Sequence, residues 1–331
     1  MTAQSLKGKK VLITGGLGFV GSNLAHRCLD LGAQVTIYDC LDPHSGGNLY
    51  NINDIKDDVE ILFSDILNFD EVSRRISGKD ILFNCAASTS HPFSMREPWI
   101  DLDVNCRAVI NLLEAAKRFN KDIRFIHIGT STQLGKLHKK PADELHPEFP
   151  TDIYSANKSV SEKYVLIYGN AYEMPVTVVR LPNVFGPRAS IHSPEFTFVN
   201  YFIGLALQGK DITVYGDGAQ LRNVIYIDDV ISALLKTAAS DKTIGEVLFA
   251  VGDEHFSVKQ IAENIVRQIG HGQFRSIPWP GERKVTEIGD AVISNEKAKK
   301  LLNWTPQETM LSGLTKVKDY YLPRLQHYLG K

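Results

Sequence analysis

Cysteine is scarce in this chain, and histidine is scattered along it. Among the 331 residues are only four cysteines, Cys28, Cys40, Cys85 and Cys106, and they form no CxxC pair. A disulfide framework or a zinc site needs paired cysteines, or His and Cys at ligand spacing. The sequence therefore predicts reduced thiols and no metal site.

The chain also lacks an excess of one charge and any long apolar run. Its formal net charge is −1, so no broad basic field points to nucleic acid or to an anionic membrane as a partner. No run reaches the roughly 18 apolar residues of a membrane span. The polar start, MTAQSLKGKK, has no apolar core of a signal peptide. We therefore expect a cytoplasmic protein that binds any anionic ligand through a few placed groups.

Short apolar strands alternate with amphipathic helices through the first half of the chain. The predicted strands are 9–14, 33–39, 59–65, 80–87, 123–130 and 176–181. The predicted helices are 19–31, 102–119 and 154–172, where apolar residues recur at helical spacing. This alternation is typical of an α/β fold in which helices cover both faces of a doubly wound parallel sheet.

Glycine and proline become denser after Arg180, as in PNVFGPR, VYGDGAQ and SIPWPGER. We predict a first, Rossmann-type domain over residues 1–180, to which residues 224–251 return as a helix and a last strand. Residues 181–223 and 252–331 would form a smaller, mixed α/β portion that binds the substrate. A single continuous domain is the alternative.

A glycine-rich turn, VLITGGLGFVG, joins the first predicted strand to the first helix. Gly15, Gly18 and Gly21 would allow a tight turn and close approach of the backbone to a pyrophosphate, which the free N–H groups of the helix would bind. Asp39 ends the second strand, where a carboxylate accepts hydrogen bonds from a ribose 2′-OH and repels a 2′-phosphate. NAD is therefore predicted over NADP. Asp65, after the third strand, either faces the adenine or caps the next helix.

Tyr154 and Lys158 lie four residues apart on a predicted helix, so their side chains share a face. A lysine ammonium and a positively charged nicotinamide would favour the tyrosinate and make Tyr154 a general base near neutral pH. Thr130 ends the 123–130 strand and could hydrogen-bond the same substrate oxygen. A lone YxxxK is usually a solvent-exposed helix face, but the dinucleotide turn upstream favours the catalytic interpretation.

Taken together, TGGLGFVG, NCAA, GTS and YSANK resemble the extended short-chain dehydrogenase/reductase family, in its NAD-dependent sugar-nucleotide epimerase/dehydratase branch. The resemblance continues through RLPNVFGPR, VYGDGAQLRNVIYIDDV and PGERKVTEIGD to KAKKLLNW, and so covers nearly the whole chain. It implies a Rossmann NAD domain and a smaller C-terminal domain that holds a nucleoside-diphosphate sugar. It also implies a homodimer, formed through the two long helices that begin near Leu102 and Tyr154.

The resemblance assigns roles to individual residues of this chain. The catalytic group would be Thr130, Tyr154 and Lys158. The residues that would hold NAD are Gly15, Gly18, Phe19, Val20, Gly21, Asp39, Asp65, Ile66, Ala86, Ala87, Tyr154 and Lys158. Those that would hold the substrate are Ser131, Thr132, Asn183, Arg222 and Arg283, with the two arginines on the diphosphate. Asn105 would support the site structurally.

The segment GTSTQLG lacks the carboxylates of some family members. In the family's 4,6-dehydratases an Asp and a Glu follow the catalytic Thr, and in its decarboxylases a Glu lies two residues after it. Here the two positions are Ser131 and Thr132. A hydroxyl cannot replace a carboxylate as a general base near neutral pH, so elimination and decarboxylation each lose a required group. Inversion at C4 needs only Tyr154, Lys158 and NAD.

The predicted function is therefore an NAD-dependent nucleoside-diphosphate-sugar 4-epimerase, acting through transient oxidation to a 4-keto sugar and return of the hydride to its other face. Three segments depart from the family pattern: QLG replaces VYG, RLPN replaces RxFN, and TSHPFSM lies at the wall of the sugar pocket. The alternatives are a CDP-tyvelose-type 2-epimerase, a keto-sugar reductase or a non-catalytic NAD-binding protein. UDP is the expected nucleotide, while CDP, GDP, dTDP and the identity of the sugar stay open.

Overall fold

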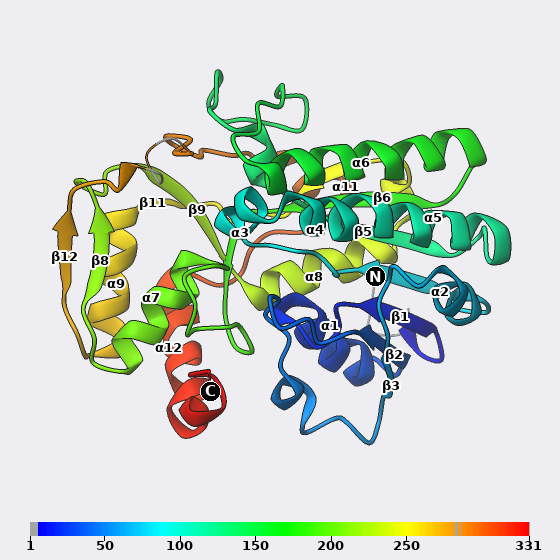
Figure 1. Ribbon diagram of the computed structural model, residues 1–331, viewed down its shortest axis with the longest axis horizontal. Coiled ribbons are helices and arrows are strands. Elements are labelled where there is room, and N and C mark those ends of the chain that lie inside the picture. The colour runs from blue at the N-terminus through cyan, green and yellow to red at the C-terminus, as the bar shows by residue number, and fades with distance from the viewer. Residues whose placement is uncertain (1–5, 282–283, 285, 331) are drawn as a thin grey trace.

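The computed structural model describes residues 6–281, 284 and 286–330, and a seven-stranded parallel sheet forms its centre (Figure 1). In spatial order the strands are β10 (Val247–Phe249), β6 (Val176–Leu181), β5 (Arg124–Thr130), β4 (Ile81–Asn84), β1 (Lys10–Thr14), β2 (Gln34–Asp39) and β3 (Glu60–Phe63). The chain starts in the middle, winds outward to β3, and then returns to wind outward in the other direction. This order confirms the predicted doubly wound α/β fold and leaves a crevice where the winding reverses, between β1 and β4.

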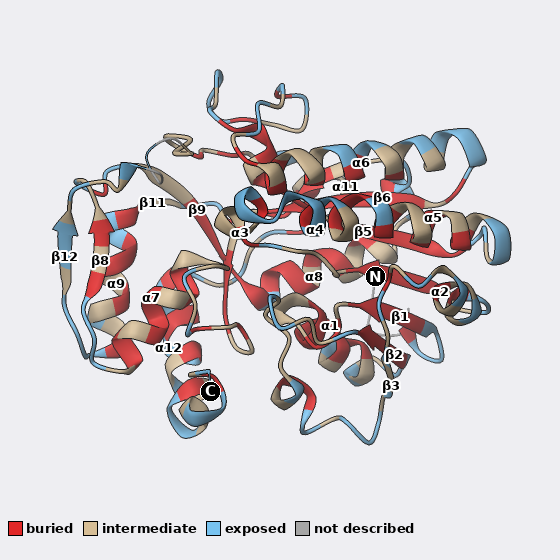
Figure 2. Cartoon of the chain, viewed as in Figure 1, coloured by how far each residue is buried: buried red, intermediate tan, exposed pale blue. Residues whose placement is uncertain are grey.

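Helices cover both faces of this sheet because its strands are apolar on both sides. All residues of β4 and β6 are buried. One face packs on α1 (Phe19–Asp30) and α8 (Ile227–Ala238). The other face packs on α2 (Phe69–Ile76), α5 (Ala108–Phe119) and α6 (Ile153–Tyr172). Figure 2 shows the buried residues concentrated on the strands and on the inner sides of these helices.

The helix that the sequence predicts over residues 102–119 is longer and less regular in the structure. It begins with α4 (Pro98–Leu102), passes through a π-helical turn (Asp103–Arg107) and continues as α5. The π turn contains Asn105, whose side-chain amide donates to the carbonyl of Ser88 at 2.8 Å. The turn therefore braces the segment that follows β4, where the predicted site begins, as π turns near functional sites often do.

The remainder of the chain builds a smaller, mixed portion, at the left of Figure 1. One sheet has the order β11 (His255–Ser257), β9 (Leu221–Tyr226) and β7 (Asn183–Phe185), and β8 (Ile212–Tyr215) pairs in parallel with β12 (Phe274–Ile277). The helices of this part of the chain are α7 (Phe198–Leu207), α9 (Val258–Ile269), α11 (Glu296–Leu302) and α12 (Met310–Tyr321). Of these, α11 packs on α8 and β10, beside the large sheet. Within the described residues, the short helix α3 (His91–Arg96) and 3₁₀ turns over Leu49–Ile52, Ser131–Leu134, Asp241–Thr243 and Leu322–His327 also occur.

The structure adds three observations on the features that the sequence lacks. None of the four cysteines is in a disulfide. Within the part of the chain that the structure describes, no three His, Cys, Asp or Glu side chains gather as metal ligands would. No helix of that part is long and apolar enough to cross a bilayer.

Candidate active site

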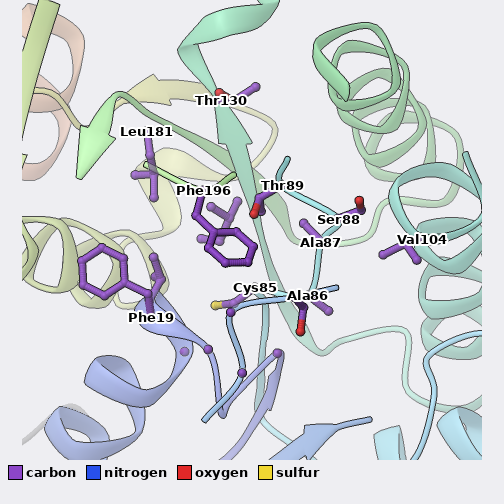
Figure 3. Close-up of a pocket in the computed structure, with 18 of the residues that line it drawn as sticks. Phe19, Cys85, Ala86, Ala87, Ser88, Thr89, Val104, Thr130, Leu181 and Phe196 are labelled. Carbon is purple, nitrogen blue, oxygen red and sulfur yellow. The ribbon is translucent and has the colours of Figure 1, made fainter. Parts of the chain in front are cut away.

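A cavity lies at the carboxyl ends of β1, β4 and β5, at the point where the sheet reverses its winding. Figure 3 shows Phe19, Phe196, Thr130 and the segment Cys85 to Thr89 around it. Each residue assigned to NAD from the sequence lines this cavity: Gly15, Gly18, Phe19, Val20, Gly21, Asp39, Asp65, Ile66, Ala86, Ala87, Tyr154 and Lys158. The fold therefore gathers in one place residues that are spread over almost 150 positions of sequence.

The backbone of the glycine turn lies so close to neighbouring backbone that side chains at Gly15 and Gly21 would not fit. Gly15 has a φ of +64°, and a Cβ atom there would lie 2.8 Å from the backbone of Ala86. A Cβ atom on Gly21 would lie 2.3 Å from the carbonyl oxygen of Gly15. The turn leads into α1, whose first turn carries no acidic residue, so its positive dipole end and free N–H groups face the cavity without competition. This cradle fits the pyrophosphate of a dinucleotide.

Asp39 has a second function that the sequence did not reveal. Its carboxylate accepts hydrogen bonds from the backbone N–H of Leu17 (3.0 Å) and of Leu41 (2.8 Å), so it holds the glycine turn against the loop after β2. Burial raises the pKa of Asp39, and these two N–H groups oppose that rise. A carboxylate has further lone pairs for a ribose hydroxyl. Asp65 lines the cavity and also accepts from the N–H of Leu67 (2.8 Å), whereas the cap of α2 is Asn68.

Tyr154 lies in the first turn of α6, close to the end of β5. Its hydroxyl lies beside the side chain of Thr130, which lowers the pKa of Tyr154. The hydroxyl of Thr130 is 3.0 Å from that of Thr132, which in turn accepts from Ser155 at 2.9 Å. A chain of hydroxyl groups thus leads from the tyrosine into the protein. Lys158, one turn further along α6, is buried and donates to the carbonyl of Ile128 at 2.6 Å.

Burial shifts the proton affinities of both groups, Tyr154 and Lys158, away from their usual values. Burial raises the pKa of Tyr154 above its usual value, and the hydrogen bond with Thr130 offsets only part of the rise. Burial also lowers the pKa of Lys158 to about 8, against the attraction of Asp101. The lysine alone therefore does not make Tyr154 a base near neutral pH. The positive end of α6 and a cationic ligand beside the ring would act in the required direction.

A second cavity, of about 660 Å³, adjoins the first and extends toward the smaller part of the chain. Its volume is in the range of small-molecule sites. The two cavities share five lining residues, which are His91, Ser131, Thr132, Asn183 and Phe196. Of the residues assigned to the substrate, Ser131, Thr132, Asn183 and Arg222 line this second cavity. Arg283 lies outside the described residues.

Arg222, on β9, presents its guanidinium at the wall of the second cavity. It donates to the carboxylate of Glu287 at 2.6 Å and to the carbonyls of Gly289 (2.5 Å) and Leu221 (2.9 Å). These contacts hold the guanidinium of Arg222 at the cavity wall, so an anion bound in the cavity could contact it beside Glu287. Arg222 thus attaches Glu287 and Gly289 to the cavity wall, and Thr151 adds a hydrogen bond to the carbonyl of Thr286 at 3.3 Å.

The structure adds two residues that sequence reasoning did not single out, His91 and Asp152. The imidazole of His91 lines both cavities, and its Nδ1 is 2.8 Å from the carboxylate of Asp152, the N-cap of α6. His91 belongs to TSHPFSM, which was predicted to lie at the sugar pocket, so the sequence contained an indication of this residue. It contained no indication that His91 pairs with Asp152, because 61 positions separate the two residues.

A buried ion pair supports the site from behind. Arg180, at the end of β6, donates to both carboxylate oxygens of Glu162 on α6, at 2.7 and 2.6 Å. Gln133 donates to Glu162 and to Glu148, each at 3.1 Å, and Glu148 also accepts from Arg180. The network therefore fixes α6 against β6 and against the turn that carries Ser131 and Thr132.

The comparisons with known proteins agree with this geometry. The model of the NAD dependent epimerase/dehydratase family matches residues 11–252. The chain belongs to this family. NAD is therefore its cofactor, and the glycine cradle and Asp39 fit that molecule.

The proteins that match nearly the whole of this chain have different activities. The UDP-glucose 4-epimerase of Mycolicibacterium smegmatis is 27% identical over 324 residues, which cover 96% of this chain and 100% of that protein. The UDP-N-acetyl-alpha-D-glucosaminuronate decarboxylase of Bacillus cytotoxicus is 29% identical over 330 residues, 95% of this chain and 98% of that one. The structure of Thermotoga maritima UDP-glucose 4-epimerase with UDP-glucose superimposes with a TM-score of 0.86 at 26% identity, covering 96% of this chain and 99% of that one. The chain is thus one of a family of NAD-dependent sugar-nucleotide enzymes, and its particular reaction has to be argued from the site.

Proposed function

We propose that this protein is a nucleoside-diphosphate-sugar 4-epimerase, with UDP as the nucleotide. The observation that carries the proposal is the composition of the wall where the two cavities meet. It offers hydroxyls at 131 and 132, where elimination and decarboxylation would need carboxylates, while the first cavity beside it offers Tyr154, Thr130 and Lys158 for oxidation of an alcohol. Oxidation at C4, rotation and reduction need no further acid–base group.

Each of the three residues has a defined task in that reaction. Tyr154 takes the proton from the 4-hydroxyl of the sugar, and Thr130, whose side chain lies beside that of Tyr154, holds the same oxygen. Lys158 adds a buried positive charge that stabilises the tyrosinate once it forms. NAD, when bound, accepts the hydride of C4 and later returns it. Thr132 and Ser155 continue the hydroxyl chain and orient Thr130.

Inversion requires that the 4-keto sugar present its other face before it is reduced. The second cavity is large enough for a nucleotide sugar, and a diphosphate anchored at Arg222 and Asn183 would let the sugar rotate about its glycosidic linkage. Fixed cationic and amide donors are suited to a pyrophosphate dianion. The names of the M. smegmatis and T. maritima relatives support UDP-glucose as the first substrate to try.

The proposal is tested by an NMR time course with UDP-glucose, UDP-glucuronate and UDP-N-acetylglucosamine, each deuterated at C4. We expect one of them to reach an equilibrium mixture with its C4 epimer, with deuterium still at C4, because the hydride never leaves the enzyme. A product inverted at C2, loss of carbon dioxide or water, or net reduction of a keto sugar would contradict the proposal.

Replacing Arg222 by glutamine should weaken the binding of UDP. Hydrogen bonds to a charged group contribute about 1.5–3 kcal/mol, so the Kd should rise by roughly 10- to 100-fold, which calorimetry would measure. The matched control is Arg275→Gln on β12, since Arg275 is exposed and lines neither cavity. Equal affinity in the wild type and both variants would place the diphosphate elsewhere.

We also propose that two copies pair through α4 and α6. These helices are in contact, and they leave large apolar side chains exposed: Trp99 (76%), Ile167 (56%), Val160 (40%) and Ile100 (37%). Such an apolar patch is typical of an interface. Light scattering should give the mass of a dimer for the wild type and of a monomer for Trp99→Glu. Leu145→Glu, at a side chain that is 92% exposed on another segment, is the control that should stay dimeric. A monomeric wild type would contradict the proposal.

A further inference from the structure

The imidazole of His91 stands where the two cavities meet, directly beside the tyrosine of the proposed reaction. It lines both cavities together with Ser131 and Thr132. Its ring lies edge to face with that of Tyr154, with ring centroids 4.8 Å apart and an angle of 77° between the planes. The side chain of His91 is 36% exposed, whereas that of Asp152 is only 5% exposed. The histidine therefore faces the space that a sugar would occupy, and the aspartate stands behind it.

Asp152 fixes the orientation and the protonation pattern of this imidazole. One carboxylate oxygen accepts from the N–H of Ser155 (2.8 Å) as the N-cap of α6, and the other is 2.8 Å from Nδ1 of His91. Although burial opposes it, the hydrogen bond with His91 helps to lower the pKa of Asp152, so the carboxylate is ionised. An ionised carboxylate only accepts hydrogen bonds, so Nδ1 carries the hydrogen and Nε2 of the neutral ring is an acceptor. Within the described residues, Nε2 has no hydrogen-bond partner.

An aspartate that holds Nδ1–H while Nε2 is free toward a cavity is the arrangement of a general base. A simple strut between α3 and α6 would not need a ring that lines both cavities. Glu195, whose carboxylate also lines the second cavity, accepts hydrogen bonds from Ser90 and from Arg96 and is therefore already engaged. His91 is thus the group best placed to exchange a proton with a bound sugar.

We propose that His91 is a second catalytic residue, a general base that acts on the carbon next to the ketone of a 4-keto sugar nucleotide, with Asp152 as its positioning residue. The proposal rests on the proposed function for the class of ligand, a nucleoside-diphosphate hexose oxidised at C4. It adds an activity to that function, the exchange of carbon-bound hydrogen with solvent at C3 or C5.

The step is balanced without any redox partner. The C–H bond beside the ketone breaks, its proton moves to Nε2 of His91, and its electron pair forms the carbon–carbon double bond of an enolate. The former ketone oxygen carries the negative charge and is held by the hydroxyls of Thr130 and Tyr154. The imidazolium, faced by the Asp152 carboxylate, exchanges its proton with water and returns one to the same carbon, which restores the ketone.

The experiment supplies the ketone directly, so that it does not depend on oxidation by the enzyme. The full-length protein with NAD is incubated with UDP-4-keto-6-deoxyglucose in D₂O, and NMR follows the loss of the hydrogen signals at C3 and C5. We expect exchange at one of the two carbons well above the rate in buffer alone. His91→Asn should reduce the enzyme-dependent rate by about 10²-fold or more. Asp152→Asn should reduce it similarly, although asparagine still caps α6.

His26→Asn is the matched control. His26 also pairs with an aspartate, Asp54, at 3.5 Å, but it lines neither cavity, so its variant should exchange hydrogen at the wild-type rate. The formation of the C4 epimer from the UDP-sugars is measured on the same variants, and exchange should fall more steeply than epimerisation. Thermal unfolding of each variant shows whether it is folded.

The outcomes separate this proposal from the proposed function. Exchange no faster than in buffer, or equal exchange in the wild type and in folded His91→Asn, overturns the role of His91 and leaves the 4-epimerase untouched. Exchange that requires His91 in a protein that forms no C4 epimer supports the base and contradicts the 4-epimerase. Equal losses of exchange and epimerisation in folded Asp152→Asn overturn its role as the positioning residue of this base.

Discussion

Replacing Tyr154 by phenylalanine is expected to slow the formation of the C4 epimer by roughly 10²- to 10⁴-fold, the usual contribution of a general base. The change removes one oxygen from a buried ring and leaves the ring in place against His91. Thr130 would still hold the substrate oxygen but cannot take its proton near neutral pH. The rate is followed by NMR on the UDP-sugar that the wild type converts, and UDP binding is measured in parallel to show that the second cavity is intact.

Tyr164→Phe is the matched control for this prediction. Tyr164 lies on the same helix, α6, and is partly buried against the core on that face of the sheet, but it lines neither cavity. This variant should epimerise at the wild-type rate. A Tyr154→Phe variant that is as active as Tyr164→Phe would show that another group takes the proton, and the catalytic interpretation of YSANK would be wrong.

The second large effect is expected on stability, from Arg180→Met. Arg180 and Glu162 are both only 2% exposed, and the guanidinium meets both oxygens of that carboxylate. Removing one partner of a buried ion pair destabilises a protein by about 3–5 kcal/mol. Lys163, at 3.4 Å, and Gln133, at 3.1 Å, would still face the Glu162 carboxylate, so we expect the lower end of that range. Differential scanning calorimetry should therefore give a much lower Tm for Arg180→Met than for the wild type.

An exposed ion pair supplies the control for that experiment. Arg74 pairs with Glu71 on the surface of α2, and its side chain is 66% exposed. Such pairs contribute at most about 1 kcal/mol, so Arg74→Met should leave the Tm almost unchanged. The double variant Arg180→Met, Glu162→Leu should recover part of the loss, since the most deeply buried carboxylate is removed together with its partner, while Glu148 keeps its ion pair with Lys163. Equal effects of Arg74→Met and Arg180→Met would mean that burial does not decide the strength of these pairs.

Much of the large sheet could be predicted, because its strands are short apolar runs that alternate with segments whose apolar residues recur at helical spacing. The six strands predicted before residue 181 all appear, in the fold class that was expected. The π turn at Asp103–Arg107 could not be predicted, because residues there keep helical spacing while the hydrogen-bond pattern changes. The pairing of β8 with β12 was equally hidden, since more than 50 residues lie between them and neither strand is apolar throughout.

For the site, the sequence indicated residue types but not their partners. The twelve residues assigned to NAD all line one cavity. The reason is that loops and helix starts after parallel strands gather at the carboxyl edge of the sheet. Contacts between distant segments were not accessible: Asp152 with His91, Glu287 with Arg222, and Lys158 with the carbonyl of Ile128. The prediction about Tyr154 missed the cost of burial, which depends on how completely the neighbours exclude water and not on local sequence.

The position of β10 has a consequence for how the chain is made. β10 pairs with β6, and the N–H of Ala250 donates to the carbonyl of Arg180, yet the ribosome reaches β10 only after α7, α8 and the strands between them. Until then the emerging β6 presents a row of unpaired N–H and C=O groups, a template to which another nascent chain can add a strand. Synthesis therefore passes through an aggregation-sensitive stage that ends only when the last strand docks.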